Sequence, residues 1–330
     1  MFGELGLIGN VIVLIVALVV LNRASDVAIT HSINVASATG LGKTTVGFIL
    51  VAFATSLPEL CVAIFSVLDP ETIAVSIGNV LGSNIVNICL VLGVCFLLIA
   101  FKFPRVTKSL PKMAKSEIGS LNFGLFVASI VPLALLYIGY ASRFIGVILL
   151  VIFIFYMYNL VRAKTPSEEV PSGAERRNLR KYMSLSIIGT VGVVVCAYFI
   201  VESASYLALS VGIPKIVIGA TIVAFGTGVP ELVTSIGALK KGHLGMALGN
   251  IVGSCFMNIT CILGITLTAS TLSINVSAFS NVAIFSLVAN LLLWYFLSNE
   301  RVGWREGAIL LFMYALFLIT SFGGWNPNST

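Results

Sequence analysis

The sequence has 330 residues, of which 58% are hydrophobic and only 10% are charged. Soluble globular proteins carry charge on roughly a quarter of their residues, so this composition excludes a soluble enzyme, a nucleic-acid binder and a disordered chain. Mean hydropathy is +1.07, and apolar runs of about 20 residues, each long enough to cross a bilayer, recur from end to end. The sequence therefore predicts a polytopic protein of the cell membrane.

Ten apolar runs, separated by charged residues or by Pro and Gly, predict ten transmembrane helices and an all-α fold. In chain order they cover 5–22, 44–66, 73–99, 119–138, 143–161, 182–203, 214–237, 245–269, 277–297 and 305–322. The stretch 162–181 is the only long polar linker. It divides the chain into a first half, 1–161, and a second half, 182–330, with five predicted helices each.

The basic residues predict how these helices are oriented. If the N-terminus lies outside, 17 of the 19 Lys and Arg residues fall in loops facing the cytoplasm, and only Arg143 and Lys215 do not. Cytoplasmic loops of membrane proteins are enriched in Lys and Arg. We therefore expect both termini outside and the linker 162–181 in the cytoplasm.

Two sequence blocks occur once in each half. Residues 47–60 match 219–232 at an offset of 172, and both copies contain Thr-x-x-Pro-Glu. The pattern Gly-Asn-x-x-Gly-Ser at 78–83 returns at 249–254. Because the offset spans five predicted helices, the two copies cross the membrane in opposite directions. Inverted repeats of this kind build many secondary transporters, whose binding site lies where the halves meet.

Each copy of the first block places one glutamate, Glu59 or Glu231, in the middle of a predicted helix. An ionised carboxylate at that depth costs several kcal/mol and needs a compensating charge. No Lys or Arg lies at a matching depth of the predicted helices, so a bound cation or protons must supply it. The alternative interpretation is two permanently protonated glutamates that hydrogen-bond neighbouring helices.

The residues around the glutamates favour a cation. Thr55 and Thr227 lie one helical turn before them and share their helix faces. Two polar stripes with i, i+4, i+8 spacing follow, Asn79, Ser83 and Asn87 in one half and Asn250, Ser254 and Asn258 in the other. Carboxylate, hydroxyl and amide oxygens suit a hard cation such as calcium, whereas zinc or copper would favour His or Cys.

These blocks resemble the α-repeats of the calcium/cation antiporter superfamily, most closely those of its prokaryotic sodium/calcium exchangers. The two α-repeats would cover about 44–99 and 214–269. The resemblance implies sodium/calcium exchange by alternating access, in which predicted helices 1 and 6 slide against the other eight. Calcium and sodium are the implied transported ions, without a cofactor and without a nucleic-acid partner.

The resemblance also assigns roles to individual residues. Glu59 and Glu231 would bridge calcium, and Thr55 and Thr227 would add oxygen ligands. The other implied ligands are the carbonyls of Ala52 and Ala224, the sodium ligands Ser56, Ser83 and Ser254, and the residues bordering the middle position, Asn87 and Asn258.

Two departures from the family pattern carry expectations of their own. Gly228 stands where the family usually has a polar residue, as Ser56 does in the first half, so one sodium site should be weaker or hydrated. Asn87 and Asn258 are both amides, although many potassium-dependent members have Asp at one of these positions, which argues against potassium co-transport. A calcium/proton exchanger that uses the same glutamates is the alternative function. An intramembrane enzyme is a remote one, because the sequence lacks midplane histidines and a nucleophile–base pair.

Overall fold

The computed structural model describes residues 2–38, 55–68, 72–102, 115–138, 140–162, 178–240, 244–269, 272–273, 276–299 and 302–323. Nearly all of these residues are helical, which confirms the all-α class. Within the described ranges, the only strands are the two-residue segments β1 (Tyr140–Ala141) and β2 (Leu272–Ser273), which pair in antiparallel fashion.

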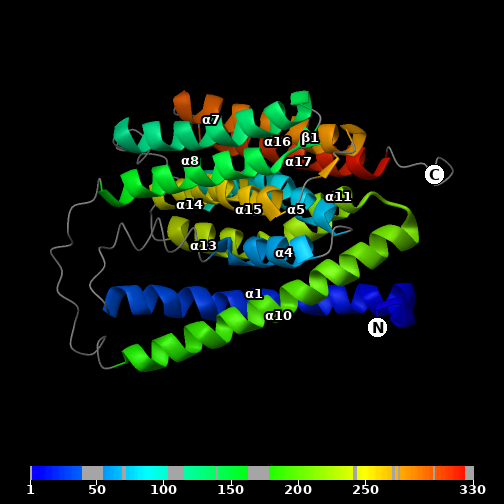
Figure 1. The fold of residues 1–330 in the computed structure, drawn as a ribbon. Coiled ribbons are helices and arrows are strands. Elements are labelled where there is room, and N and C mark those ends of the chain that lie inside the picture. Colours follow the sequence, from blue (N-terminus) through cyan, green and yellow to red (C-terminus); the bar gives the residue numbers. More distant parts are fainter. Residues whose placement is uncertain are drawn as a thin grey trace.

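Along the chain the helices form two series, one before and one after the polar linker, coloured blue to green and green to red in Figure 1. The first series consists of α1 (Phe2–Ala38), α4 (Leu57–Leu68), α5 (Ile73–Ile85), η2 (Val86–Leu92), α6 (Gly93–Lys102), α7 (Lys115–Ile138) and α8 (Arg143–Arg162), where η denotes a π-helical segment. The second consists of α10 (Leu179–Val211), α11 (Lys215–Ile218), η4 (Gly219–Val223), α12 (Ala224–Thr227), α13 (Val229–Lys240), α14 (Leu244–Met257), η5 (Asn258–Ile262), α15 (Leu263–Ala269), α16 (Val276–Ser298) and α17 (Trp304–Gly323).

Six helical stretches among the described residues are long and apolar enough to cross a membrane, and a bent pair of helices makes a seventh. The chain is therefore a multi-pass membrane protein, as the composition predicts. Of the span predicted over 44–66, residues 44–54 lie outside the described residues, and residues 57–66 belong to α4.

The first helix of each series is longer than the sequence predicts. The predicted spans 5–22 and 182–203 become α1, which continues to Ala38, and α10, which ends at Val211. Arg23 therefore lies within a helix and not in a loop. The two helices run in opposite directions along one side of the molecule (Figure 1). Their mutual packing extends the helical structure beyond the apolar runs from which the spans were predicted.

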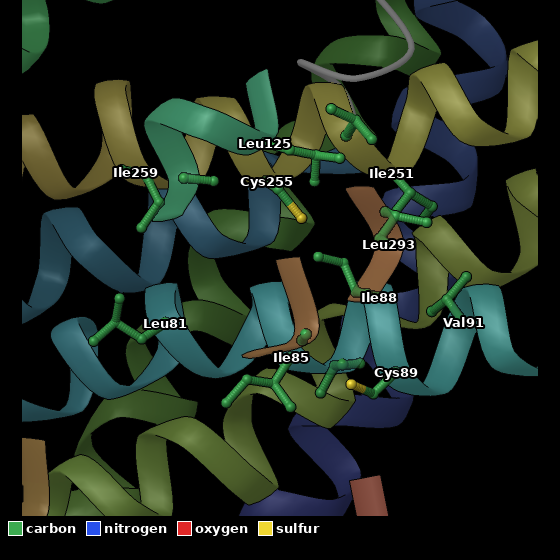
Figure 2. Packing of buried hydrophobic residues seen from close by; sticks show 14 of the residues in the cluster. Leu81, Ile85, Ile88, Cys89, Val91, Leu125, Ile251, Cys255, Ile259 and Leu293 are labelled. Atoms are coloured by element: carbon green, nitrogen blue, oxygen red, sulfur yellow. The ribbon is translucent and has the colours of Figure 1, made fainter. Parts of the chain in front are cut away.

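The core lies where α5 and η2 pack against helices of the second half. Every residue of α5 except Ala74 is buried. Figure 2 shows Ile88 of this stretch pointing toward Cys255 of α14 and Leu293 of α16 in an apolar cluster. A helix buried on all sides has no solvated face, so its polar residues lie inside the protein and need partners there.

Small residues bring α5 close to α11 and η4. A side chain at Gly78 would overlap the backbone of Ile216, and one at Gly82 would overlap the backbone of Ala220. The small-xxx-small spacing of these two glycines therefore lets the two backbones touch. This contact joins the polar stripe of one half to the broken helix of the other.

The helix over 214–240 is broken at Gly228, where α12 and α13 meet at 41°. The break lies next to Pro230, whose ring nitrogen cannot donate a backbone hydrogen bond. Glu231 follows directly, in the first turn of α13. The break therefore gives this carboxylate a place at a helix N-terminus inside the protein.

Candidate cation-binding site

The two glutamates occupy equivalent positions in the two series of helices. Glu59 lies in the first turn of α4 and Glu231 in the first turn of α13, and both side chains are completely buried. Helix N-termini carry partial positive charge and stabilise a carboxylate there. The two carboxyl groups are close enough to interact electrostatically. Two acids from opposite halves thus meet in the interior.

Each carboxyl group accepts a hydrogen bond from a serine of its own half. Ser83 Oγ lies 3.4 Å from Glu59 Oε1, and Ser254 Oγ lies 3.4 Å from Glu231 Oε1. The Oε2 atoms of both glutamates are buried without a hydrogen-bond partner among the described residues. One oxygen of each acid is thus held in place, and the other remains able to bind a cation or a proton.

The threonines connect the two halves. Thr227 Oγ1 donates to Asn79 Oδ1 over 3.2 Å, and Thr55 Oγ1 donates to Asn250 Oδ1 over 3.4 Å. Thr227 also interacts with Glu59, and Thr55 with Glu231. Each of these threonine contacts therefore occurs twice, once with the threonine of the first half and once with that of the second.

The environment of the glutamates contains oxygen donors and no described basic group. The side chains that interact with the two carboxyl groups are hydroxyls, the thiols of Cys61 and Cys255, and the other carboxyl. Burying an ionised acid without a partner costs several kcal/mol. The arrangement can therefore be ionised only together with mobile cations, and its oxygen atoms are ligands that sodium and calcium accept.

The remaining predicted ligands are buried but make fewer contacts. Ser56 Oγ and both polar atoms of Asn87 have no hydrogen-bond partner among the described residues. Asn258 Nδ2 donates to Asn84 Oδ1 over 3.3 Å, which leaves Asn258 Oδ1 without a partner in the described part of the chain. The Ala224 carbonyl accepts the Gly228 N–H at 3.0 Å.

Ala52, the matching first-half residue, lies outside the described residues.

Two π-helical segments begin at equivalent points of the repeats. Asn87 is the second residue of η2, and Asn258 is the first residue of η5. A π-helical turn shifts backbone hydrogen bonds from four to five residues apart and is frequently found at functional sites. The residue pattern of the two blocks carries no signal for these π-helical turns, so the sequence did not predict them.

Sequence reasoning also missed four polar contacts around the site. The polar stripes contain Asn79 and Asn250, but their role as acceptors for the threonines of the opposite half was not foreseen. Asn84 pairs with Asn258, and Ser235 accepts a hydrogen bond of 3.2 Å from Asn250 Nδ2. Ser235 lies four residues after Glu231, on the same helix face. That spacing was the available signal.

The fold and these buried, paired acids define a class of multi-pass membrane protein with an intramembrane acidic site between two related halves. Residues 9–162 and 181–323 match the family described as sodium/calcium exchanger protein, and the chain belongs to this family. The match confirms the resemblance to the calcium/cation antiporter superfamily.

Relatives cover nearly the whole chain. An uncharacterized membrane protein of Methanocaldococcus jannaschii is 31% identical over 304 residues, covering 92% of this chain and 94% of the relative. The sodium/calcium exchanger MaX1 of Methanosarcina acetivorans is 28% identical over 358 residues, covering 95% and 98%.

Solved structures show the same fold. The sodium-calcium exchanger NCX_Mj, soaked with Na⁺ and Sr²⁺, has a TM-score of 0.65 and 29% identity, covering 94% of this chain and 98% of that one. The H⁺/Ca²⁺ exchanger CAX has a TM-score of 0.72 with 15% identity, covering 95% and 87%. At that identity the second likeness concerns the fold alone.

Proposed function

We propose that this protein is a secondary active antiporter that exchanges sodium for calcium at Glu59 and Glu231. The observation that carries the proposal is the pair of buried carboxyl groups, each with one oxygen unpartnered among the described residues, surrounded by hydroxyl and amide oxygens from both halves. Membership of the sodium/calcium exchanger family supports it, as do the sodium/calcium exchanger MaX1 and NCX_Mj, a relative studied with Na⁺ and Ca²⁺.

The proposed architecture is ten membrane-spanning helices in two inverted five-helix repeats, with both termini outside. Residues 1–161 and 182–330 form the two halves, and the linker 162–181 lies in the cytoplasm. The opposite directions of α1 and α10, the first helices of the two halves, support the inversion (Figure 1). The matching contacts of the two glutamates, Ser83 with Glu59 and Ser254 with Glu231, support it independently.

In the proposed site, Glu59 and Glu231 bridge calcium, and Thr55 and Thr227 add hydroxyl ligands. Sodium would use the same acids together with further oxygens of the two α-repeats. Those further ligands are Ser56, Ser83, Ser254, the carbonyls of Ala52 and Ala224, and the bordering amides Asn87 and Asn258.

Coupling would follow from charge compensation. Calcium neutralises the two carboxylates, and so does filling with sodium, whereas the empty site carries two uncompensated charges. Closing an empty, doubly charged site inside the membrane costs several kcal/mol, so the transporter changes access only when it is loaded. We expect α1 and α10, which pack along one side of the other helices, to slide during this change.

Calcium flux in proteoliposomes tests the proposal. Vesicles containing the purified protein and calcium are exposed in turn to sodium, potassium and proton gradients, with ionophores that remove each competing gradient. We expect a sodium gradient to drive calcium movement and a collapsed pH gradient to leave that movement intact. Flux that follows only the pH gradient would replace sodium exchange with the calcium/proton alternative.

A matched substitution controls for effects of charge removal as such. Glu306 lies in the first turn of α17 and makes no part of the site. Glu306→Gln should therefore retain sodium-driven calcium flux in the same vesicles. If Glu306→Gln lost as much calcium flux as a Glu59 variant, the assignment of the site to Glu59 and Glu231 would be wrong.

A further inference from the structure

We propose that Ser235 is a positioning residue for the cation site, acting through Asn250 on the hydroxyl group of Thr55. This inference rests on the proposed function, since it concerns how one ligand of that site is oriented. Ser235, Asn250 and Thr55 come from three different helical segments, and their side chains form one continuous hydrogen-bonded chain. The chain ends beside Glu231, with which Thr55 interacts.

A threonine hydroxyl binds a cation through its oxygen lone pairs, so its single hydrogen must point elsewhere. Two acceptors lie 3.4 Å from Thr55 Oγ1: the hydroxyl of Ser254, which donates its own hydrogen to Glu231 Oε1, and the amide carbonyl of Asn250, which is the stronger acceptor. The carbonyl oxygen of Asn250, 3.4 Å from Thr55 Oγ1, accepts the hydrogen of Thr55. With the hydrogen of Thr55 on Asn250, the oxygen lone pairs of Thr55 can face an ion that binds at Glu231.

The arrangement works only if the Asn250 amide presents its oxygen, and not its nitrogen, to Thr55. An amide turned by 180° would aim two hydrogens at Thr55 and require the threonine to accept one. Ser235 Oγ accepts a hydrogen from Asn250 Nδ2 at 3.2 Å and so holds the amide nitrogen on the opposite side. Ser235 is fully buried and Asn250 is 5% exposed, so water competes little for either partner.

The first half shows what happens without this residue. Ala63 stands at the position that corresponds to Ser235 at the offset of the first block. The equivalent amide, Asn79, has an Nδ2 atom without a hydrogen-bond partner among the described residues. Asn79 Oδ1 instead receives the hydrogen of Thr227 at 3.2 Å, and it lies 3.5 Å from Ser83 Oγ, which donates to Glu59. The two halves thus orient the same amide by different means, and only the second uses a dedicated acceptor.

Removal of this acceptor should weaken ion binding without removing a ligand. We expect Ser235→Ala to raise the calcium concentration for half-maximal exchange about 3- to 10-fold, the effect of one buried hydrogen bond on the affinity of the site. The maximal exchange rate should stay close to that of the wild type, and the melting temperature without calcium should fall only by the effect of one lost buried hydrogen bond. Ser235→Cys, with similar volume but a weak acceptor, should behave in the same way.

The matched control removes another buried hydroxyl. Ser286 of α16 is fully buried and its Oγ has no partner among the described residues. Ser286→Ala should leave the calcium dependence unchanged. Exchange rates are measured in proteoliposomes over a range of calcium concentrations, and calcium-dependent thermal shifts of the same variants in detergent give binding independently of sodium.

The outcomes separate the inference from the function on which it rests. A Ser235→Ala protein with the wild-type calcium dependence would overturn the positioning role. So would a melting temperature that falls in the absence of calcium together with an unchanged half-saturating concentration, because that pattern belongs to a packing residue. A wild-type protein without a calcium-dependent thermal shift would instead overturn the proposed function, whatever the variants do.

Discussion

Gly228 offers the most specific test of how the site is built, because it replaces an expected hydroxyl at the break between α12 and α13. Its backbone dihedrals, φ −81° and ψ −2°, are open to any residue. A Cβ atom here would lie 3.0 Å from Val86 Cγ1 and 3.1 Å from the Ala224 carbonyl oxygen. Both contacts are tight, so the neighbours must move by a few tenths of an ångström.

The same position is favourable for a new hydroxyl group. The Cβ atom would lie 3.8 Å from Asn87 Oδ1, which accepts no hydrogen bond from a described residue. In Gly228→Ser the hydroxyl can donate to this oxygen and turn its lone pairs toward a bound ion. We expect overpacking to cost about 1–2 kcal/mol of stability. The new ligand should raise sodium affinity about 3- to 10-fold, the range for one ordinary net hydrogen bond.

Gly228→Ala separates the two effects, since it adds the same Cβ without the hydroxyl. Sodium dependence of calcium flux and the melting temperature are measured for both variants. Both should melt at a similarly lowered temperature, but only Gly228→Ser should need less sodium for half-maximal exchange. Equal sodium dependence of the two variants would refute the reasoning that a missing ligand weakens this site.

Other predictions concern packing and topology. Gly82→Ala should lower the free energy of unfolding by about 3 kcal/mol or more, and with it the melting temperature, because the methyl group overlaps the Ala220 backbone. Gly237→Ala, whose added Cβ has no atom within 4 Å, should be neutral or stabilising, and equal losses would contradict the close helix contact. The six native cysteines are all buried, so an introduced cysteine should dominate labelling by a membrane-impermeant maleimide. Gly3→Cys should react in intact cells and Asn178→Cys only after permeabilisation; the reverse result would contradict the predicted orientation.

Much of this molecule follows from the sequence because the same signals occur twice. The observed helix ends lie within three residues of the predicted spans at 73–99, 143–161, 245–269, 277–297 and 305–322. These helices are bounded by charged residues or loops, which mark the ends of an apolar run. The break before Glu231 was also predictable, since proline removes a backbone donor wherever it stands.

What the sequence did not predict depends on contacts between segments. The extension of α1 and α10 beyond the apolar runs comes from their packing on each other, which hydropathy does not record. The π-helical turns at Asn87 and Asn258 depend on how neighbouring helices fit. Ser235 belongs to no repeated block, because its first-half counterpart is Ala63, and it gains its role only from the adjacent amide of Asn250.

The central claim is that two buried acids are compensated by mobile ions, and equilibrium binding of radioactive calcium to the purified protein tests it most directly. Wild-type protein and Glu306→Gln should bind calcium, and added sodium should displace it. Glu59→Gln and Glu231→Gln should each lose at least about 3 kcal/mol of binding free energy, or a hundredfold in affinity, and remain folded. A folded variant of either glutamate that binds calcium as tightly as the wild type would contradict the account.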